Sequence, residues 1–160
     1  PTVAGQYSVE VDAAGQAVDT SPWHLVVYPA PLCASTSAIE FPQKSTSGTY
    51  VAGTQYTALI TARDQYGNIR TADHRQQCDV ARFQLEFTGP KAVVWHIQET
   101  PVGSGTYAAS FMFEMKGQYV ALGTCDGSSI SDDPSTAECS FEVVPGEAYG
   151  PACHVRQSSD

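Results

Sequence analysis

Short runs of alternating apolar and polar residues fill most of the chain, and most end at turn residues such as glycine or proline. Successive side chains of a β-strand point to opposite faces, so such a run predicts a strand with one buried face. About seven runs lie in the body of the chain, at 37–41, 56–62, 80–88, 93–98, 107–113, 119–124 and 140–144. No segment has a sustained helical period. The pattern predicts an all-β fold, an antiparallel immunoglobulin-like β-sandwich.

Two short phrases recur along the chain. Gly5-Gln6-Tyr7 returns as Gly117-Gln118-Tyr119, and Pro31-Leu32-Cys33 returns as Pro151-Ala152-Cys153. Recurrence at a nearly constant period indicates tandem modules. We expect three parts: residues 1–30 as the closing hairpin of a preceding repeat, residues 31–146 as a complete repeat, and residues 147–160 as a linker and the start of a following repeat.

The first part supplies only two predicted strands, 6–11 and 23–28, so it cannot bury a core by itself. Trp23 and Trp95 stand at strand positions, and large aromatic side chains of this kind are expected in a core rather than against a ligand. Asp64 precedes Gly67-Asn68, and an Asp in this position caps a turn that closes the preceding strand.

The chain carries 17 acidic and 8 basic residues, a formal charge of −9, and no basic patch. Nucleic-acid phosphates would repel such a surface, so we expect no nucleic-acid partner. No apolar run approaches the roughly 20 residues of a membrane helix, so we expect no direct membrane insertion in this segment.

Four landmarks together resemble the filamin-type immunoglobulin-like repeat. They are Thr61-Ala62-Arg63-Asp64-Gln65-Tyr66-Gly67-Asn68, Gly103-Ser104-Gly105-Thr106-Tyr107, Gly117-Gln118-Tyr119 and Phe141-Glu142-Val143-Val144-Pro145-Gly146. The chain departs from the family in longer loops near 45–53, 70–77 and 128–138. The resemblance implies an array of β-sandwiches that contact neighbouring repeats of the same chain and other proteins.

The same resemblance implies a binding strand. Filamin repeats capture partners by adding a peptide strand beside their third strand, which matches residues 80–88 of this chain. Arg82, Gln84 and Glu86 would then point outward and meet the partner. The simpler alternative is that these three side chains form only the solvated face of the strand.

Cys125 and Cys139 flank the loop of the last predicted hairpin. The aligned positions of the first repeat are Ala13 and Ser21, so both cysteines are absent there together, as expected of a cross-strand disulfide. Cys33 and Cys78 are expected near the same end of the sandwich and form a second candidate pair. Swapped pairings stay open. Disulfides would indicate an oxidising compartment.

Other chemistry is less well supported by the residue pattern. His74 and Cys78 are four residues apart and His154 follows Cys153, so these side chains are candidate metal ligands. Asp126, Asp132 and Asp133 could bind calcium. None of these spacings matches a known ligand motif, and no nucleophile, base and orienting group come together. We therefore expect no metal, no cofactor and no enzyme.

The sequence thus predicts a structural or adhesive module of a filamin-like tandem array, at the cell surface or outside the cell. Adhesion at the surface of a gamete or another cell is one form of this hypothesis. The alternative is an intracellular scaffold or crosslinker, cytoplasmic (cytoskeletal) or ciliary, with reduced cysteines.

Overall fold

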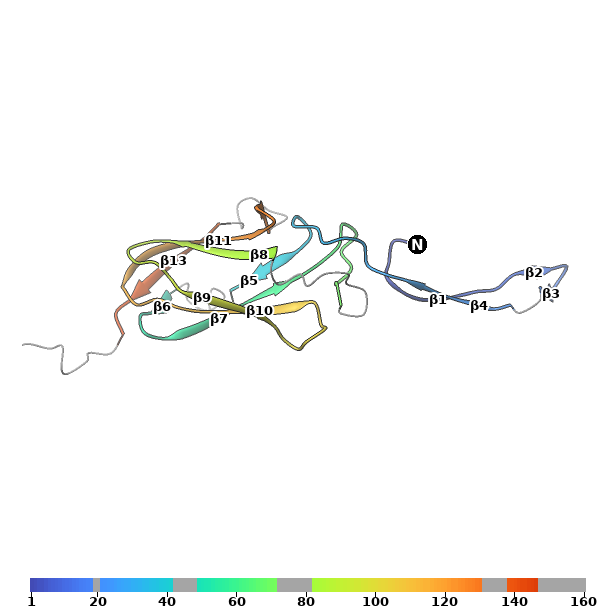
Figure 1. The fold of residues 1–160 in the computed structure, drawn as a ribbon, viewed down its shortest axis with the longest axis horizontal. Coiled ribbons are helices and arrows are strands. Elements are labelled where there is room, and N and C mark those ends of the chain that lie inside the picture. Colours follow the sequence, from blue (N-terminus) through green and yellow to red (C-terminus); the bar gives the residue numbers. More distant parts are fainter. Residues whose placement is uncertain (19–20, 42–48, 72–81, 131–137, 147–160) are drawn as a thin grey trace, which may run out of the picture.

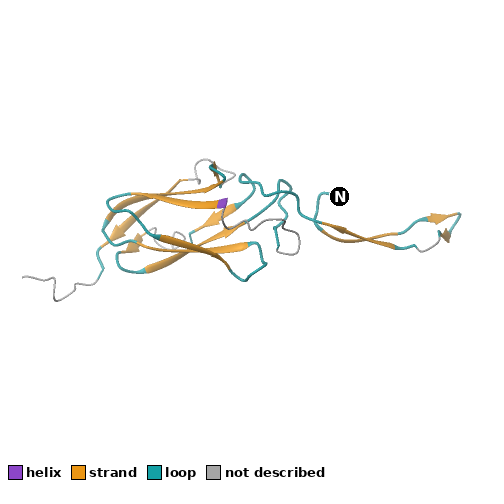
Figure 2. Cartoon of the chain, in the orientation of Figure 1, coloured by secondary structure: helices purple, strands orange, loops and turns teal. Residues whose placement is uncertain are grey.

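The computed structural model describes residues 1–18, 21–41, 49–71, 82–130 and 138–146. Within these ranges two sheets form two layers, and a separate hairpin extends from one end of them (Figure 1; Figure 2). The predicted all-β sandwich is therefore confirmed.

The first sheet is antiparallel throughout. Its strands, in spatial order, are β5 (Ala38–Glu40), β7 (Gln55–Thr61), β10 (Thr106–Met112) and β9 (Trp95–Glu99). The second sheet has the order β8 (Phe83–Thr88), β11 (Gly117–Cys125), β13 (Glu138–Val144) and β6 (Thr49–Val51), and the short β12 (Ser128–Ser129) pairs with the end of β11. Each predicted strand overlaps one of these elements, although residues 80 and 81 lie outside the described ranges.

Strand β6 lies within a segment that the sequence predicted to be a loop. It runs parallel to β13, and the register continues through the bond from Ala52 N to Val144 O, 2.9 Å. Three residues are too few for alternation to be recognised, and the segment's serine, threonine and glycine residues are typical of loops. The sheet therefore gains a strand that only its tertiary partner specifies.

An aromatic cluster fills the space between the sheets. Tyr50 from β6 is fully buried, with its ring 4.6 Å from that of Tyr56 and 4.8 Å from that of Phe141, both edge to face. Phe113 packs 5.5 Å from Tyr50 and 4.7 Å from Tyr119. Burial raises the pKa of Tyr50 to about 12, so its phenol stays neutral.

The hairpin at the start of the chain repeats the last hairpin of the sandwich. Strand β1 (Gly5–Val9) pairs with β4 (Trp23–Val27), with Gly5 opposite Val27, just as Gly117 lies opposite Val143. At its tip, β2 (Asp12–Ala13) pairs with β3 (Gln16–Ala17), as the end of β11 pairs with β12. Residues 3–18 thus match residues 115–130 in strand pairing.

Hydrogen bonds and turn angles follow the same equivalence. The Tyr7 hydroxyl donates to Val3 O at 2.6 Å, and the Tyr119 hydroxyl donates to Met115 O at 3.1 Å. Such a bond to the backbone a few residues upstream is a feature of immunoglobulin-type sandwiches. The turns agree as well, with φ of 53° and 79° at Ala14-Gly15 and of 50° and 77° at Asp126-Gly127. The recurring Gly-Gln-Tyr phrase therefore marks one structural unit present twice.

The first hairpin, unlike the equivalent hairpin of β11 and β13, is not packed against a second sheet in the described chain. No strand outside the hairpin pairs with or covers it in the described chain, and its apolar side chains are exposed, including Leu25 at 51% and Trp23 at 40%. The expectation of a core position is wrong for Trp23 in this structure. Trp95, on β9, is half buried against the core as expected.

The strand register also corrects the alignment of the cysteines. Val27 of β4 is equivalent to Val143 of β13. Four residues earlier in each strand, Trp23 is therefore equivalent to Cys139, whereas the sequence alignment had paired Ser21 with Cys139. Cys139 lies opposite Ala121, and Cys125 lies four residues farther along β11, which corresponds to about 13 Å. A disulfide needs Cα atoms within roughly 7 Å. This register argues against the predicted bridge between Cys125 and Cys139.

Cys33 and Cys125 lie at the same end of the sandwich. Cys33 N donates to Arg63 O just beyond β7, and Cys125 lies opposite Phe83, whose ring packs 5.2 Å from Tyr107. Tyr107 in turn pairs with Ile60 near the end of β7. Cys78 and Cys153 are outside the described residues, so the second bridge stays a prediction.

We expect the cysteines of the reduced, folded protein to react at different rates. Cys33 is partly exposed, and hydrogen bonds with the side chains of Ser35 and then Thr36 lower the pKa of its thiol. Cys125 and Cys139 are buried at 2% and 5% exposure. Alkylation followed by peptide mass mapping should modify Cys33 at least about tenfold faster than Cys125 or Cys139. Equal rates would contradict the described burial.

Two glycines in tight turns provide a matched test of packing. Gly105 has φ of 74°, and a Cβ there would lie 2.5 Å from the Arg70 carbonyl oxygen, whereas Gly127 has φ of 77° and open space around it. Gly127→Ala should lower the free energy of unfolding by about 1 kcal/mol through backbone strain alone. Gly105→Ala should cost about 3 kcal/mol because a clash is added. Urea unfolding measures both, and equal losses would contradict the close approach at Gly105.

Candidate binding groove along strand β8

Strand β8 is an edge strand of the second sheet. Among the described strands it pairs only with β11, and β9 at the corresponding edge of the first sheet pairs only with β10. Both edges face the same side of the sandwich, because residues of β8 and β9 line one groove of about 650 Å³. We call this feature the β8–β9 groove.

The β8–β9 groove is lined by both apolar and polar side chains. Phe87, Val93, Trp95 and Ile97 line it and also pack against the core, so their positions are fixed by the fold. Gln84, Glu86 and Thr124 line it from the second sheet. A surface of this kind suits an extended chain with some apolar side chains.

One backbone bond determines which groups of β8 point into the open edge. Asp126 N donates to Arg82 O at 3.0 Å, and these residues continue the β8–β11 register. Residues opposite each other in an antiparallel pair alternate between hydrogen-bonded and non-hydrogen-bonded pairs. Gln84 and Glu86 therefore bond to β11, and the backbone groups of Phe83, Leu85 and Phe87 point away from it.

The side chains of β8 are distributed as the alternation predicted. Phe83 and Leu85 are buried at 2% and 3%, and Gln84 and Glu86 are exposed. The outward-facing candidates Gln84 and Glu86 are therefore available on the surface. Their own backbone groups, however, belong to the internal ladder, a distinction that side-chain alternation does not reveal.

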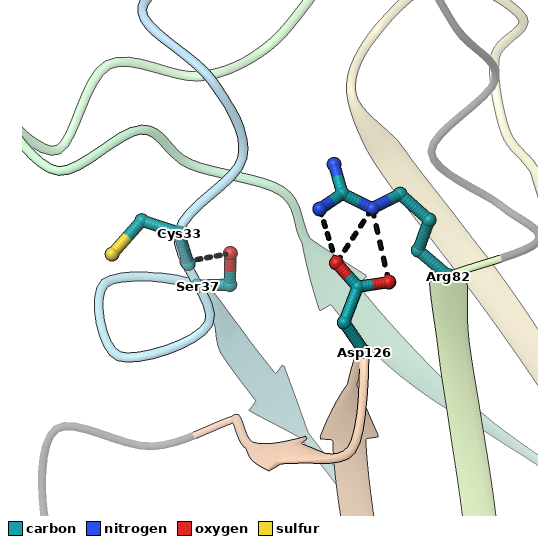
Figure 3. Close-up of polar contacts among 4 residues, drawn as sticks. All are labelled: Cys33, Ser37, Arg82 and Asp126. Carbon is teal, nitrogen blue, oxygen red and sulfur yellow. Dashed lines mark hydrogen bonds and ion pairs between the residues drawn. The ribbon is translucent and has the colours of Figure 1, made fainter.

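Arg82 has a different environment from the one expected. Its Nε lies 2.9 Å from Asp126 Oδ2 and 3.1 Å from Oδ1, and Nη2 also contacts Oδ2, as Figure 3 shows. A hydrogen bond from Arg82 lowers the pKa of Asp126. Arg82 thus ties the start of β8 to the β11–β12 turn, and in this structure it is engaged within the module.

The same ion pair bears on the calcium alternative. Asp126 has a guanidinium as its neighbour, and Asp132 and Asp133 lie outside the described residues. Within the described ranges no three His, Cys, Asp or Glu side chains gather as metal ligands, and no helix there is long and apolar enough to cross a membrane.

A buried serine positions Cys33 near the start of the first sheet. The Ser37 hydroxyl donates to Cys33 O at 2.8 Å (Figure 3). It also accepts the Arg63 N–H at 3.1 Å. Ser37 is only 2% exposed, so both bonds are shielded from water. This contact fixes the backbone around Cys33 and brings no catalytic partner to its thiol.

Comparison with known proteins gives matches among solved structures alone. No protein-family model and no curated protein matches the chain. The whole filamin domain of Lin-41 aligns with 73% of this chain, at 18% identity and a TM-score of 0.53.

Two bacterial structures match over nearly the whole chain. InvD of Yersinia pseudotuberculosis aligns with 96% of it at 18% identity and a TM-score of 0.60, and the Escherichia coli adhesin FdeC aligns with 90% at 20% identity and 0.57. This chain spans about two fifths of either structure, 41% in both cases. At these identities the likeness concerns the fold alone, an immunoglobulin-like sandwich similar to that of a filamin domain, as the sequence motifs predicted.

Proposed function

We propose that this chain is a non-enzymatic structural or adhesive segment of a tandem array of filamin-like repeats, which spaces and presents protein contacts. Residues 1–30 close a preceding repeat, residues 31–146 form a complete one, and residues 147–160 lead into the next. The partners are neighbouring repeats and a protein segment that adds a strand to β8.

The open edge of β8 carries the binding part of the proposal. The backbone groups of Phe83, Leu85 and Phe87 point away from β11 beside the β8–β9 groove. An incoming strand would bond to these three residues and place alternate side chains in the groove. Gln84 and Glu86 flank it and favour a partner with polar or basic groups opposite them.

The repeated hairpin supports the tandem part. Residues 3–18 share the pairing, the tyrosine hydrogen bond and the turn angles of residues 115–130. In the complete repeat this hairpin packs against a second sheet, whereas in the first copy the equivalent face is exposed. Strands preceding Pro1 would cover it, because an isolated two-stranded hairpin with an apolar face is marginally stable in water.

Adhesion outside the cell is the form of this function that we favour. FdeC is described as an adhesin, and invasin, which aligns with 89% of this chain at 16% identity and a TM-score of 0.53, is described as an integrin-binding protein. The separation of Cys125 from Cys139 along the strands favours the alternative, a cytoplasmic or ciliary scaffold with reduced cysteines.

Amide hydrogen exchange should show an alternating pattern along β8. In the free protein the amides of Phe83, Leu85 and Phe87 should exchange faster than those of Gln84 and Glu86, which bond to β11. A peptide selected from a library for binding should then protect the first set. Binding that leaves these amides unprotected would contradict strand addition.

A lysine substitution provides the matched variant for that experiment. Glu86→Lys reverses the charge beside the open edge, where lysine discourages strand pairing, and should weaken the selected peptide about tenfold. Glu142→Lys makes the same charge reversal at an exposed position of β13, an interior strand, and should leave binding unchanged. Equal effects would indicate a general charge effect and count against the edge.

Intact mass measured with and without reductant tests the compartment. An extracellular array should show a mass increase on reduction, because each disulfide takes up two hydrogens, and tryptic mapping should then identify the bridge. Unchanged mass in protein isolated under thiol-trapping conditions would favour the intracellular scaffold.

A further inference from the structure

The turn after β7 makes four side-chain hydrogen bonds with the base of the first hairpin. Asp64 is fully buried, and each of its carboxylate oxygens accepts two hydrogen bonds. Oδ1 accepts from the backbone N–H groups of Tyr66 and Asn68, both at 2.9 Å. Oδ2 accepts from Asn68 Nδ2 and from the N–H of Ala30, both at 2.8 Å. Ala30 belongs to the segment that leaves β4.

Asn68 extends the contact to the other strand of the hairpin. Its Nδ2 donates to Thr2 O at 2.9 Å, and its Oδ1 accepts the N–H of Ala4 at 2.9 Å. One partner requires a donor and the other an acceptor, so the amide can satisfy both in one orientation only. Thr2 and Ala4 immediately precede β1.

Arg70 completes the arrangement from the end of the same turn. Arg70 is buried at 7% exposure, and its Nη1 donates to Ala30 O. Both backbone groups of Ala30 are therefore held, the N–H by Asp64 and the carbonyl by Arg70. The hairpin is attached before its first strand and after its second, so rotation about a single linker is restrained.

These side chains do more than close a turn. The turn itself is closed by backbone bonds from Asp64 N to Asn68 O, 3.0 Å, and from Gly67 N to Asp64 O, 2.9 Å. Neither bond needs the Asn68 amide or the Arg70 guanidinium. The side chains of Asn68 and Arg70 are thus directed toward the first hairpin.

We propose that residues 64–70 form an inter-module clamp, in which Asp64, Asn68 and Arg70 bind the backbone at the base of the preceding repeat's closing hairpin and fix its orientation. The clamp rests on the proposed tandem arrangement, but it is testable without any binding partner. Its ligand is main chain, so it accepts any side chains at positions 2, 4 and 30 that leave these groups in place.

The charge of Asp64 suits this role. Burial alone would raise the pKa of Asp64, but hydrogen bonds from the Asn68 side chain and from the backbone of Ala30, Asn68 and Tyr66 lower it below its usual range. The carboxylate is therefore ionised at neutral pH, and its hydrogen bonds are charge-assisted.

Residual dipolar couplings of backbone amides in the full chain test the clamp. In the unmodified protein, the amides of β1 and β4 and those of the sandwich should fit one alignment tensor. Asn68→Ala removes the bonds to Thr2 and Ala4 and keeps the backbone bonds of the turn. The hairpin should then require a separate tensor of reduced magnitude, and its order parameters should fall from about 0.85 toward 0.6.

Two further variants keep the test decisive. Gln65→Ala changes an exposed side chain of the same turn and should preserve the single tensor. Ala4→Pro removes the N–H that bonds to Asn68 from the hairpin side, so it should release the hairpin even if Asn68→Ala perturbs the sandwich. Two tensors in the unmodified protein, or one tensor in both Asn68→Ala and Ala4→Pro, would overturn the clamp. Lost peptide binding with a single tensor would instead count only against the function proposed for β8.

Discussion

The packing of two sheets over one aromatic layer is the constraint on which the rest of the structure depends. Tyr50, Phe113 and Phe141 contact one another across the interior. Tyr50 and Phe141 come from β6 and β13, and Phe113 directly follows β10. Because Tyr50 must enter this layer, the chain before β7 forms the parallel strand β6. Because the layer ends at Phe87 and Trp95, the sheets remain open at the β8 and β9 edges. The β8–β9 groove is thus a product of core packing.

The strands could be predicted from the sequence wherever a buried face repeats at every second residue. The run from Phe83 to Phe87 is the clearest case, and its buried and exposed faces are those expected. Strand β6 could not be predicted, because its three residues carry no period. The alignment of Ser21 with Cys139 was also wrong, because the structural equivalent of Cys139 is Trp23, two residues later. A shift of two keeps each side chain on its face, so the apolar pattern does not expose the error.

The candidate site was predictable only in part, for a related reason. Side-chain alternation places Gln84 and Glu86 outside, but it does not say which backbone groups face β11. That choice follows from the bond between Asp126 and Arg82, which joins residues far apart in sequence. A separate ion pair between the side chains of the same two residues removes Arg82 from the set of outward-facing contacts. Asp64 and Asn68 show a similar limit. The sequence indicated that these residues form a turn, but it did not show that their side chains also bond to the backbone of the first hairpin.

The equivalence of residues 3–18 and 115–130 has a geometric consequence. Glu114 and Lys116 occupy the positions that Thr2 and Ala4 occupy in the first hairpin, so they would present the same carbonyl and N–H to an asparagine in the following repeat. If each junction is built this way, one repeat is related to the next by a constant screw operation. A chain of repeats would then wind as a regular helix. The β8 edges would follow that helix at fixed intervals, and the spacing between captured partners would be set by the protein itself.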